Sequence, residues 1–71
     1  MQDYKKIKIT VGNVMKEKRI TAYRVVKETD LRYQTVLNYR DNLISKIDLD
    51  VLAKICSVLD CAISDVLQYE E

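Results

Sequence analysis

The sequence predicts an all-α fold, a compact domain of five short helices, and three observations support this prediction. The chain has 71 residues, enough for one domain with a small core and too few for two. It contains no proline and one glycine, so few positions interrupt a helix. Apolar residues recur at spacings of three and four, as expected when one face of each helix is buried.

The first nine residues, MQDYKKIKI, are predicted to form a short extended N-terminal arm ahead of a domain that spans residues 10–71. Three interpretations of this arm remain open. It can be a solvated segment that frays, its lysines can reach the phosphate backbone of DNA, or its isoleucines can pair as a strand with the same segment of a second subunit.

A first helix is expected to begin at about Thr10, which is placed to cap it, with Val11 and Val14 pointing inward. Positively charged side chains near the C-terminal end of this helix interact favourably with the helix dipole. They are Lys16, Lys18 and Arg19. We expect the two lysines to be solvated charges rather than DNA contacts.

The stretch from Thr21 to Asn42, TAYRVVKETDLRYQTVLNYRDN, predicts two short helices joined by a tight polar turn. Its apolar positions are Val25, Val26, Leu31, Val36 and Tyr39. The Thr21 hydroxyl stands ahead of the first of these helices, about residues 22–28, where it can accept a hydrogen bond from a free backbone N–H. Because such short helices are marginal alone in water, they must share a core with neighbouring helices.

A fourth helix is predicted from Leu49 to about Leu59, with Asp48 as its cap. Its apolar stripe, at helical spacing, is expected to face the core. The stripe consists of Leu49, Leu52, Ile55, Cys56 and Leu59.

The segment after Asp60 is expected to complete the core. Cys61 and Ile63 are predicted to plug it, and a short last helix is predicted to start at Ser64 or Asp65. This helix is expected to run through Val66, Leu67 and Tyr69, whose apolar surface would close the domain or form a dimer seam.

This ordered series of apolar spacings resembles the helix-turn-helix of the lambda-repressor-like family, also called Cro-type or XRE-like. The resemblance continues through LDVLAKICSVLDCAISDVL, which is similar to the fourth and fifth helices of those domains, so it covers roughly residues 11–67. It implies that the second helix crosses the DNA backbone and that the third helix enters the major groove.

Three positions depart from the family pattern. Asp30 stands in the turn where the family has Gly, and Asp is among the residues that best tolerate a left-handed backbone there. Val26 replaces a usual Ala, which predicts a slightly wider helix crossing. Ala22 replaces a Gln that reaches a phosphate in many members, which puts that one contact in doubt.

The resemblance assigns the outward side chains of the third helix, about Arg32 to Arg40, to the DNA bases. The expected base contacts are Arg32, Tyr33, Gln34 and Asn38. Gln and Asn can pair with two atoms on the edge of adenine, Arg can do the same for guanine, and Tyr can press on a thymine methyl. Leu37 is expected to pack against Leu43 or Ile44 rather than to touch a thymine methyl.

A second group is expected to contact phosphates, which adds affinity without sequence preference. It consists of Thr21, Tyr23, Thr35, Arg40, Asn42, Ser45 and Lys46. The first free N–H groups of the second helix can assist Thr21 through the helix dipole. The loop RDNLISKI, residues 40–47, is expected to run along the phosphates, with its apolar side chains sealing the core or joining a subunit contact.

The net charge is only +1, but its distribution is polarised. Residues 1–19 carry six basic and two acidic side chains, residues 20–47 carry five and three, and residues 48–71 carry one and six. The predicted motif therefore lies in a positive half of the chain, and such polarity can orient a protein on a polyanion.

Several classes of protein are excluded or disfavoured. There is no His, no Gly-rich phosphate loop and no acid pair whose position suggests a pocket, so we expect no enzyme, no cofactor, no metal and no small-molecule ligand. No run approaches the roughly 20 apolar residues of a membrane span. The N-terminus lacks the apolar stretch of a signal peptide, so a cytoplasmic location without a membrane partner is expected.

Cys56 and Cys61 lie in an otherwise apolar helical stretch. We expect both to be reduced thiols that pack as small hydrophobic groups. Two cysteines without histidine cannot complete a four-ligand zinc site in one chain. A redox switch, or a metal shared across a dimer, remains an alternative.

The leading hypothesis is a sequence-specific, double-stranded DNA-binding transcriptional regulator of bacterial, phage or mobile-element type, which acts as a homodimer on an operator. The rival is a protein-interaction module on the same fold, such as an antirepressor. Its support is the low net charge, the apolar Leu37, Leu43 and Ile44, and the absence of Gln at Ala22. A third hypothesis is an antitoxin that binds DNA and a toxin through its terminal arms.

Overall fold

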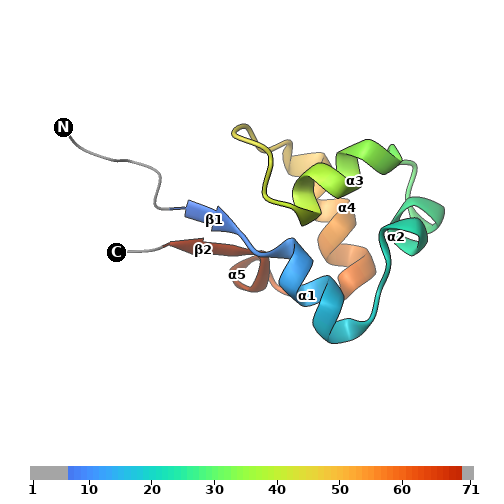
Figure 1. Cartoon of the computed structure of the whole chain (residues 1–71), viewed down its shortest axis with the longest axis horizontal. Helices are drawn as coiled ribbons and strands as arrows, with labels where there is room; N and C mark the ends of the chain where they lie inside the picture. The colour runs from blue at the N-terminus through green and yellow to red at the C-terminus, as the bar shows by residue number, and fades with distance from the viewer. Residues whose placement is uncertain (1–6, 70–71) are drawn as a thin grey trace.

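The computed structural model describes residues 7–69 as five helices and two short strands. Their order is β1 (Ile7–Ile9), α1 (Val11–Lys18), α2 (Ala22–Glu28), α3 (Tyr33–Arg40), α4 (Leu49–Leu59), α5 (Ile63–Val66) and β2 (Leu67–Tyr69). In Figure 1 the strands project to one side of the helical body, and α4 runs through its middle. α3 packs against α1 and α2, and in Figure 1 it lies along the upper edge of the helical body.

The prediction of a compact five-helix domain is confirmed, but the fold is not purely α-helical, because it also contains a small two-stranded sheet. β1 and β2 form an antiparallel pair in which Ile7 lies opposite Tyr69 and Ile9 lies opposite Leu67. Both segments alternate apolar and polar residues, which suits a ribbon with one apolar face. The last helix therefore ends at Val66 and does not continue to Tyr69. Residues 1–6 of the predicted arm lie outside the described residues.

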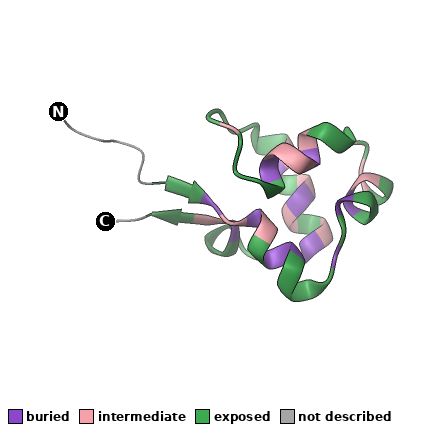
Figure 2. Cartoon of the chain, viewed as in Figure 1, coloured by how far each residue is buried: buried purple, intermediate pink, exposed green. Residues whose placement is uncertain are grey.

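The core is built from the facing sides of the helices, as the purple segments in Figure 2 show. Its fully buried side chains are Val11, Val25, Val36, Leu52, Ile55, Leu59 and Val66. Two predicted core positions are wrong: Leu49 is 78% exposed and Ile63 is 55% exposed. Each is the first residue of its helix, so the apolar spacing continues there past the edge of the packed core.

Two of the three predicted helix caps are confirmed. The Thr21 hydroxyl accepts a hydrogen bond from the Arg24 N–H at 3.2 Å, and the Asp48 carboxylate accepts from the Asp50 N–H at 2.9 Å. Thr10 precedes α1 but does not cap it through its side chain. Its hydroxyl instead donates to the Asp65 carbonyl at 2.7 Å, so this residue fastens α1 to α5.

Three helices end in the same backbone geometry, each with a left-handed residue that is not glycine. These residues are Arg19, Asn42 and Asp60, with φ of 56°, 58° and 51°. In each case the N–H of the following residue donates to the carbonyl five positions earlier: Ile20 to Met15, Leu43 to Asn38 and Cys61 to Cys56. This pattern is the Schellman motif, in which the two side chains so joined commonly touch.

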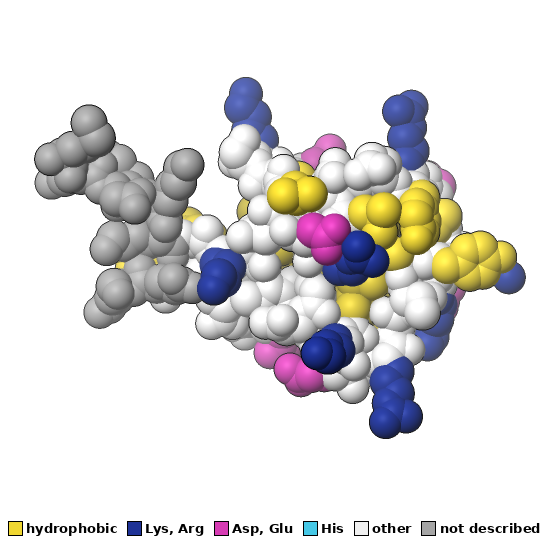
Figure 3. Space-filling model, in the orientation of Figure 1, with side chains coloured by type: hydrophobic (Ala, Val, Ile, Leu, Met, Phe, Trp, Pro, Cys, Tyr) yellow, Lys and Arg dark blue, Asp and Glu magenta, His cyan; other side chains and the backbone are white. Residues whose placement is uncertain are grey.

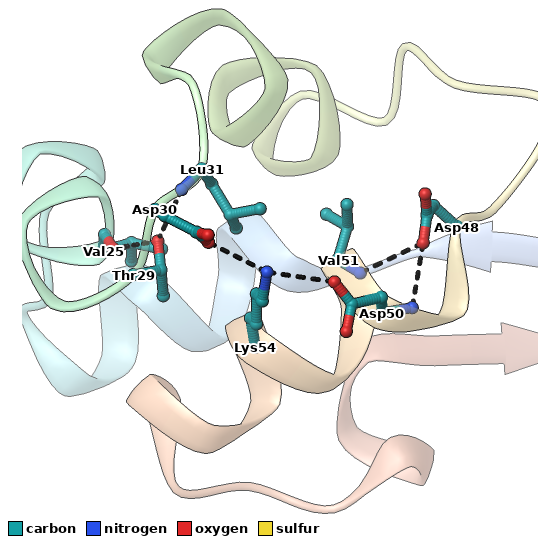
Figure 4. A network of polar contacts seen from close by, with 8 residues as sticks. All are labelled: Val25, Thr29, Asp30, Leu31, Asp48, Asp50, Val51 and Lys54. Carbon is teal, nitrogen blue, oxygen red and sulfur yellow. Dashed lines mark hydrogen bonds and ion pairs between the residues drawn. The ribbon is translucent and has the colours of Figure 1, made fainter.

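The turn between α2 and α3 is held by side chains rather than by a left-handed residue. The Thr29 hydroxyl donates to the Val25 carbonyl at 2.7 Å and accepts from the Leu31 N–H at 3.2 Å, as Figure 4 shows. Asp30, which we expected to be left-handed, does not have a positive φ. Its carboxylate instead accepts a hydrogen bond from the Lys54 ammonium at 2.8 Å, which ties the turn to α4.

The close approach of α1 to the end of α3 depends on Gly12. A Cβ at this position would lie 2.5 Å from the backbone carbonyl oxygen of Arg40. Because this neighbour is backbone, it cannot move aside as a flexible side chain does. Gly12 therefore fixes how near the C-terminal end of α3 lies to α1.

Replacing Gly12 with Ala is expected to lower the free energy of unfolding by about 1–3 kcal/mol, the usual cost of overpacking. The added methyl would push against the Arg40 carbonyl. Urea unfolding followed by circular dichroism measures the change. In an exposed helix, the same substitution would instead stabilise by roughly 1 kcal/mol, so the sign identifies the close contact. The exposed neighbour Asn13, changed to Ala, is the control.

Replacing Lys54 with Met is expected to raise the pKa of Asp30 toward its ordinary value. The Lys54 hydrogen bond is the largest cause that lowers this pKa, ahead of a backbone hydrogen bond and the charge of Lys54. Carboxyl carbon shifts followed through an acid titration by NMR measure it. An unchanged Asp30 pKa would show that the ion pair does not form in solution.

The ion pair between Lys54 and Asp30 also determines how the stability of the fold changes with pH. Because the folded pKa of Asp30 lies below its unfolded value, the stabilisation is present above the unfolded pKa. It is lost as the pH falls through the folded pKa. The K54M variant should therefore lose less stability than the parent protein on acidification, whereas Lys46→Met, on the exposed loop, should behave as the parent does.

Candidate nucleic-acid interface

The two faces of α3 have opposite character. Val36 and Tyr39 are buried at 0% and 4% exposure and anchor the helix in the core. Because a helix turns every 3.6 residues, a side chain two positions from a buried one lies on the opposite side of the helix, as Gln34 does relative to Val36. Arg32, Tyr33 and Gln34 are exposed there, at the N-terminal end of α3. This end of a helix is the part that reaches base edges when a helix lies in the major groove.

Gln34 and Asn38 act as a pair one turn apart. The Gln34 side-chain NH₂ donates to the Asn38 side-chain oxygen at 3.0 Å. Side chains at positions i and i+4 lie on the same helix face, so this bond holds both amides on the outer stripe. Gln34 and Asn38 thus lie on one side of α3, with Gln34 exposed and Asn38 half-buried, while Arg32 at its N-cap and Tyr33 in its first turn are also exposed.

A groove beside α3 is lined by several of the predicted DNA contacts, together with residues for which the sequence predicted no DNA contact. Its volume is about 490 Å³. The polar side chains that line it are Lys16, Arg19, Thr21, Tyr23, Tyr33 and Arg40. The exposed Thr21 hydroxyl accepts the Arg24 N–H and keeps its own hydrogen to donate. The groove therefore offers hydroxyls and cations together, the groups that bind phosphate oxygens.

Arg19 is the residue of this groove that sequence reasoning missed, and Lys16 was expected to be solvated. Arg19 ends α1 in a left-handed conformation, and the chain then reverses into α2. This reversal brings two cations of α1 beside the start of α2. Nothing in the spacing of the residues signals it.

Arg40 and Asp41 form an exposed bidentate ion pair, with distances of 2.8 and 3.1 Å. The hydrogen bonds from Arg40 hold the pKa of Asp41 below its ordinary value, and those to Asp41 raise the pKa of Arg40. Exposed pairs of this kind contribute little free energy, so a phosphate oxygen can compete with Asp41 for the guanidinium.

The predicted contacts of the α3–α4 loop are divided between two roles. The Asn42 side-chain oxygen accepts the Ile9 N–H at 3.2 Å, so it holds β1 and leaves only its NH₂ group for a phosphate. Ser45 and Lys46 are exposed, and Thr35 on α3 is half-buried. The loop thus combines a structural link to the strands with a polar outer surface.

The aliphatic residues near this surface also separate. Leu37 and Ile44 are half-buried and pack against the core, whereas Leu43 is 70% exposed. The expected packing of Leu37 against Leu43 or Ile44 stays a prediction. Figure 3 shows Lys and Arg side chains standing out around this side of the molecule, with hydrophobic side chains exposed among them at the end where α2 and α3 lie.

Within residues 7–69 no helix has the length and apolar character needed to cross a membrane. Comparison with curated proteins and with solved structures gave no match. A family model described as the Cro/C1-type HTH DNA-binding domain matches residues 10–71, most of the chain. The five helices, with a buried inner side of α3 and an exposed polar outer side, agree with that match. The chain belongs to the family of Cro/C1-type helix-turn-helix DNA-binding domains.

Proposed function

We propose that this domain binds a specific sequence of double-stranded DNA as a homodimer, with α3 in the major groove, and regulates transcription by occupying an operator. The observation that carries the proposal is the exposed polar end of α3. Arg32, Tyr33 and Gln34 stand clear of the core there, because Val36 and Tyr39 occupy it. Their hydrogen-bonding groups match the edges of guanine and adenine in the major groove.

Phosphate binding would come from both sides of α3. On one side lies the groove with Lys16, Arg19 and Thr21, and on the other lies the loop with Ser45 and Lys46. These contacts would set the angle at which α3 enters the groove, without adding sequence preference.

The dimer follows from the size of the interface. One α3 presents only a few base contacts, so a single domain would discriminate weakly between sequences. Two copies on half-sites roughly 34 Å apart would double the number of contacts and match a palindromic operator.

The alternative function is a protein-interaction module on the same fold. Its structural support is the exposure of Leu43 and Leu49, at 70% and 78%, near the two ends of one loop. Leu37 and Ile44 support this alternative less than the sequence suggested, because both pack against the domain's own core. A dimer contact would also use exposed aliphatic side chains, so their presence does not by itself favour an adaptor.

Selection from random duplexes, followed by a salt titration, tests the proposal. We expect a palindromic consensus and an affinity that falls about a thousandfold or more between roughly 50 and 200 mM salt, because released counterions drive phosphate binding. A protein adaptor would show no enrichment and would pass through a column of random duplex at low salt. Either result would reject the DNA-binding proposal.

Replacing Gln34 with Ala is expected to weaken binding to the selected site by about 1–3 kcal/mol and to change binding to random duplex little. The amide is exposed and bonded only to another amide of the same helix, so the fold should survive. Fluorescence anisotropy on both duplexes gives the two affinities. Equal losses on both would remove Gln34 from the base contacts.

The matched control is Lys16→Ala, which removes a cation from the groove and leaves α3 intact. It should weaken binding to both duplexes equally and lower the slope of log affinity against log salt by about 1 per domain. A loss confined to the selected site would mean that the groove does not bind phosphate.

A further inference from the structure

The C-terminal end of α4 brings the two cysteines of the chain together. Asp60 is left-handed, and the Cys61 N–H donates to the Cys56 carbonyl at 3.2 Å. The Asp60 N–H donates to the Ser57 carbonyl at 3.4 Å, which completes a Schellman motif. On an uninterrupted helix, residues five apart point about 140° away from each other. The left-handed turn instead folds Cys61 back over Cys56.

The same motif at the end of α1 shows where such side chains lie. There the joined residues are Met15 and Ile20, and both are buried, at 4% and 9% exposure. At the end of α4 the equivalent pair consists of two thiols. Each is half-buried, and neither is part of a disulfide.

The backbone bond from the Cys61 N–H to the Cys56 carbonyl brings the two cysteines to the same corner, because the side chains joined in this way by a Schellman motif commonly touch. Burial is the largest cause that raises the pKa of the Cys56 thiol to about 11, and Cys61 and Asp65 act in the same direction. Neighbouring cysteine side chains are what formation of a disulfide needs.

Cys61 is accessible to small molecules. It lines a cavity of about 430 Å³ beside α1, α5 and β2, together with Asn13, Lys18 and Gln68. The Lys18 ammonium donates to the Asp60 carbonyl at 2.9 Å and so holds this corner against α1. Cys56 does not line the cavity, so a reagent that enters it meets Cys61 first.

We propose that Cys56 and Cys61 form a dithiol site that a small disulfide, such as oxidised glutathione, converts into an intramolecular disulfide. The Cys61 thiolate attacks one sulfur of oxidised glutathione, the bond between its two sulfurs breaks, and one glutathione thiolate leaves. The Cys56 thiolate then attacks the Cys61 sulfur and releases the second glutathione thiolate. The cysteines lose two electrons and two protons in total, and glutathione gains both.

The consequence is a covalent link across the corner between the end of α4 and the start of α5. The sequence left open a redox switch or a metal shared across a dimer, and the turn that joins Cys56 and Cys61 favours the redox switch. Because the native turn already joins Cys56 and Cys61 by a backbone hydrogen bond, disulfide formation should be more favourable in the folded protein than in the unfolded chain. This effect does not depend on DNA.

The test equilibrates the folded protein with defined ratios of reduced and oxidised glutathione, traps free thiols by alkylation and weighs the products by mass spectrometry. We expect one disulfide within the chain and no retained glutathione. Protein that keeps one or two glutathiones, or that forms covalent dimers, would overturn the proposal.

Two single variants serve as controls. Cys56→Ser should retain one glutathione on Cys61, because the resolving thiol is gone. Cys61→Ser should react more slowly, since Cys56 lies away from the cavity. Equal rates for the two variants would contradict the assigned order of attack.

A second measurement isolates the contribution of the fold. The same titration in urea gives the equilibrium constant for the unfolded chain, and we expect the folded value to be larger by about tenfold or more. An equal or smaller value in the folded protein would show that the corner does not favour the disulfide.

Discussion

Burial of Val36 and Tyr39 is the constraint on which the rest of the structure depends. Val36 is fully buried, and the Tyr39 ring is buried while its hydroxyl accepts the Asp48 N–H at 3.0 Å. This bond joins the inner side of α3 to the start of α4. The polar side chains of α3 therefore point outward because its apolar side chains are buried. Any change that loosens the packing of Val36 or Tyr39 would also change the direction of the polar side chains.

The middle of the fold could be predicted from the sequence, and its edges could not. The bounds of α2 and α4 follow from apolar spacing together with the caps Thr21 and Asp48. Spacing does not show where the packed core stops, which explains the exposed Leu49 and Ile63. The extended arm was predicted, with pairing to a second subunit as one interpretation, but β2 was assigned to the last helix. The pairing of β1 with β2 joins the two ends of the described chain, a contact that no local pattern encodes.

The candidate interface divides in the same way. The exposed end of α3 was predictable, because the residues left over once the core positions are assigned must face outward. The place of Arg19 in the groove was not, since it depends on how the chain reverses after α1. Nor was the bond from Asn42 to β1, because the alternation of Ile7 and Ile9 indicates an extended segment but not which part of the chain it lies against.

The chain has only one glycine, because three left-handed helix ends where glycine is usual are occupied by other residues. Glycine is the usual residue at such a position because it carries no Cβ, so Arg19, Asn42 and Asp60 each add some strain. At Arg19 and Asn42 the side chain offsets this strain with a role that glycine would remove, a cation in the groove and a hydrogen bond to β1. At Asp60 the backbone carbonyl accepts a hydrogen bond from the Lys18 ammonium, and the turn joins Cys56 to Cys61. Asp60 therefore contributes to this corner through its backbone conformation and not through its side chain. Glycine at position 60 would keep the same turn, so the geometry of the dithiol site does not depend on the Asp60 side chain.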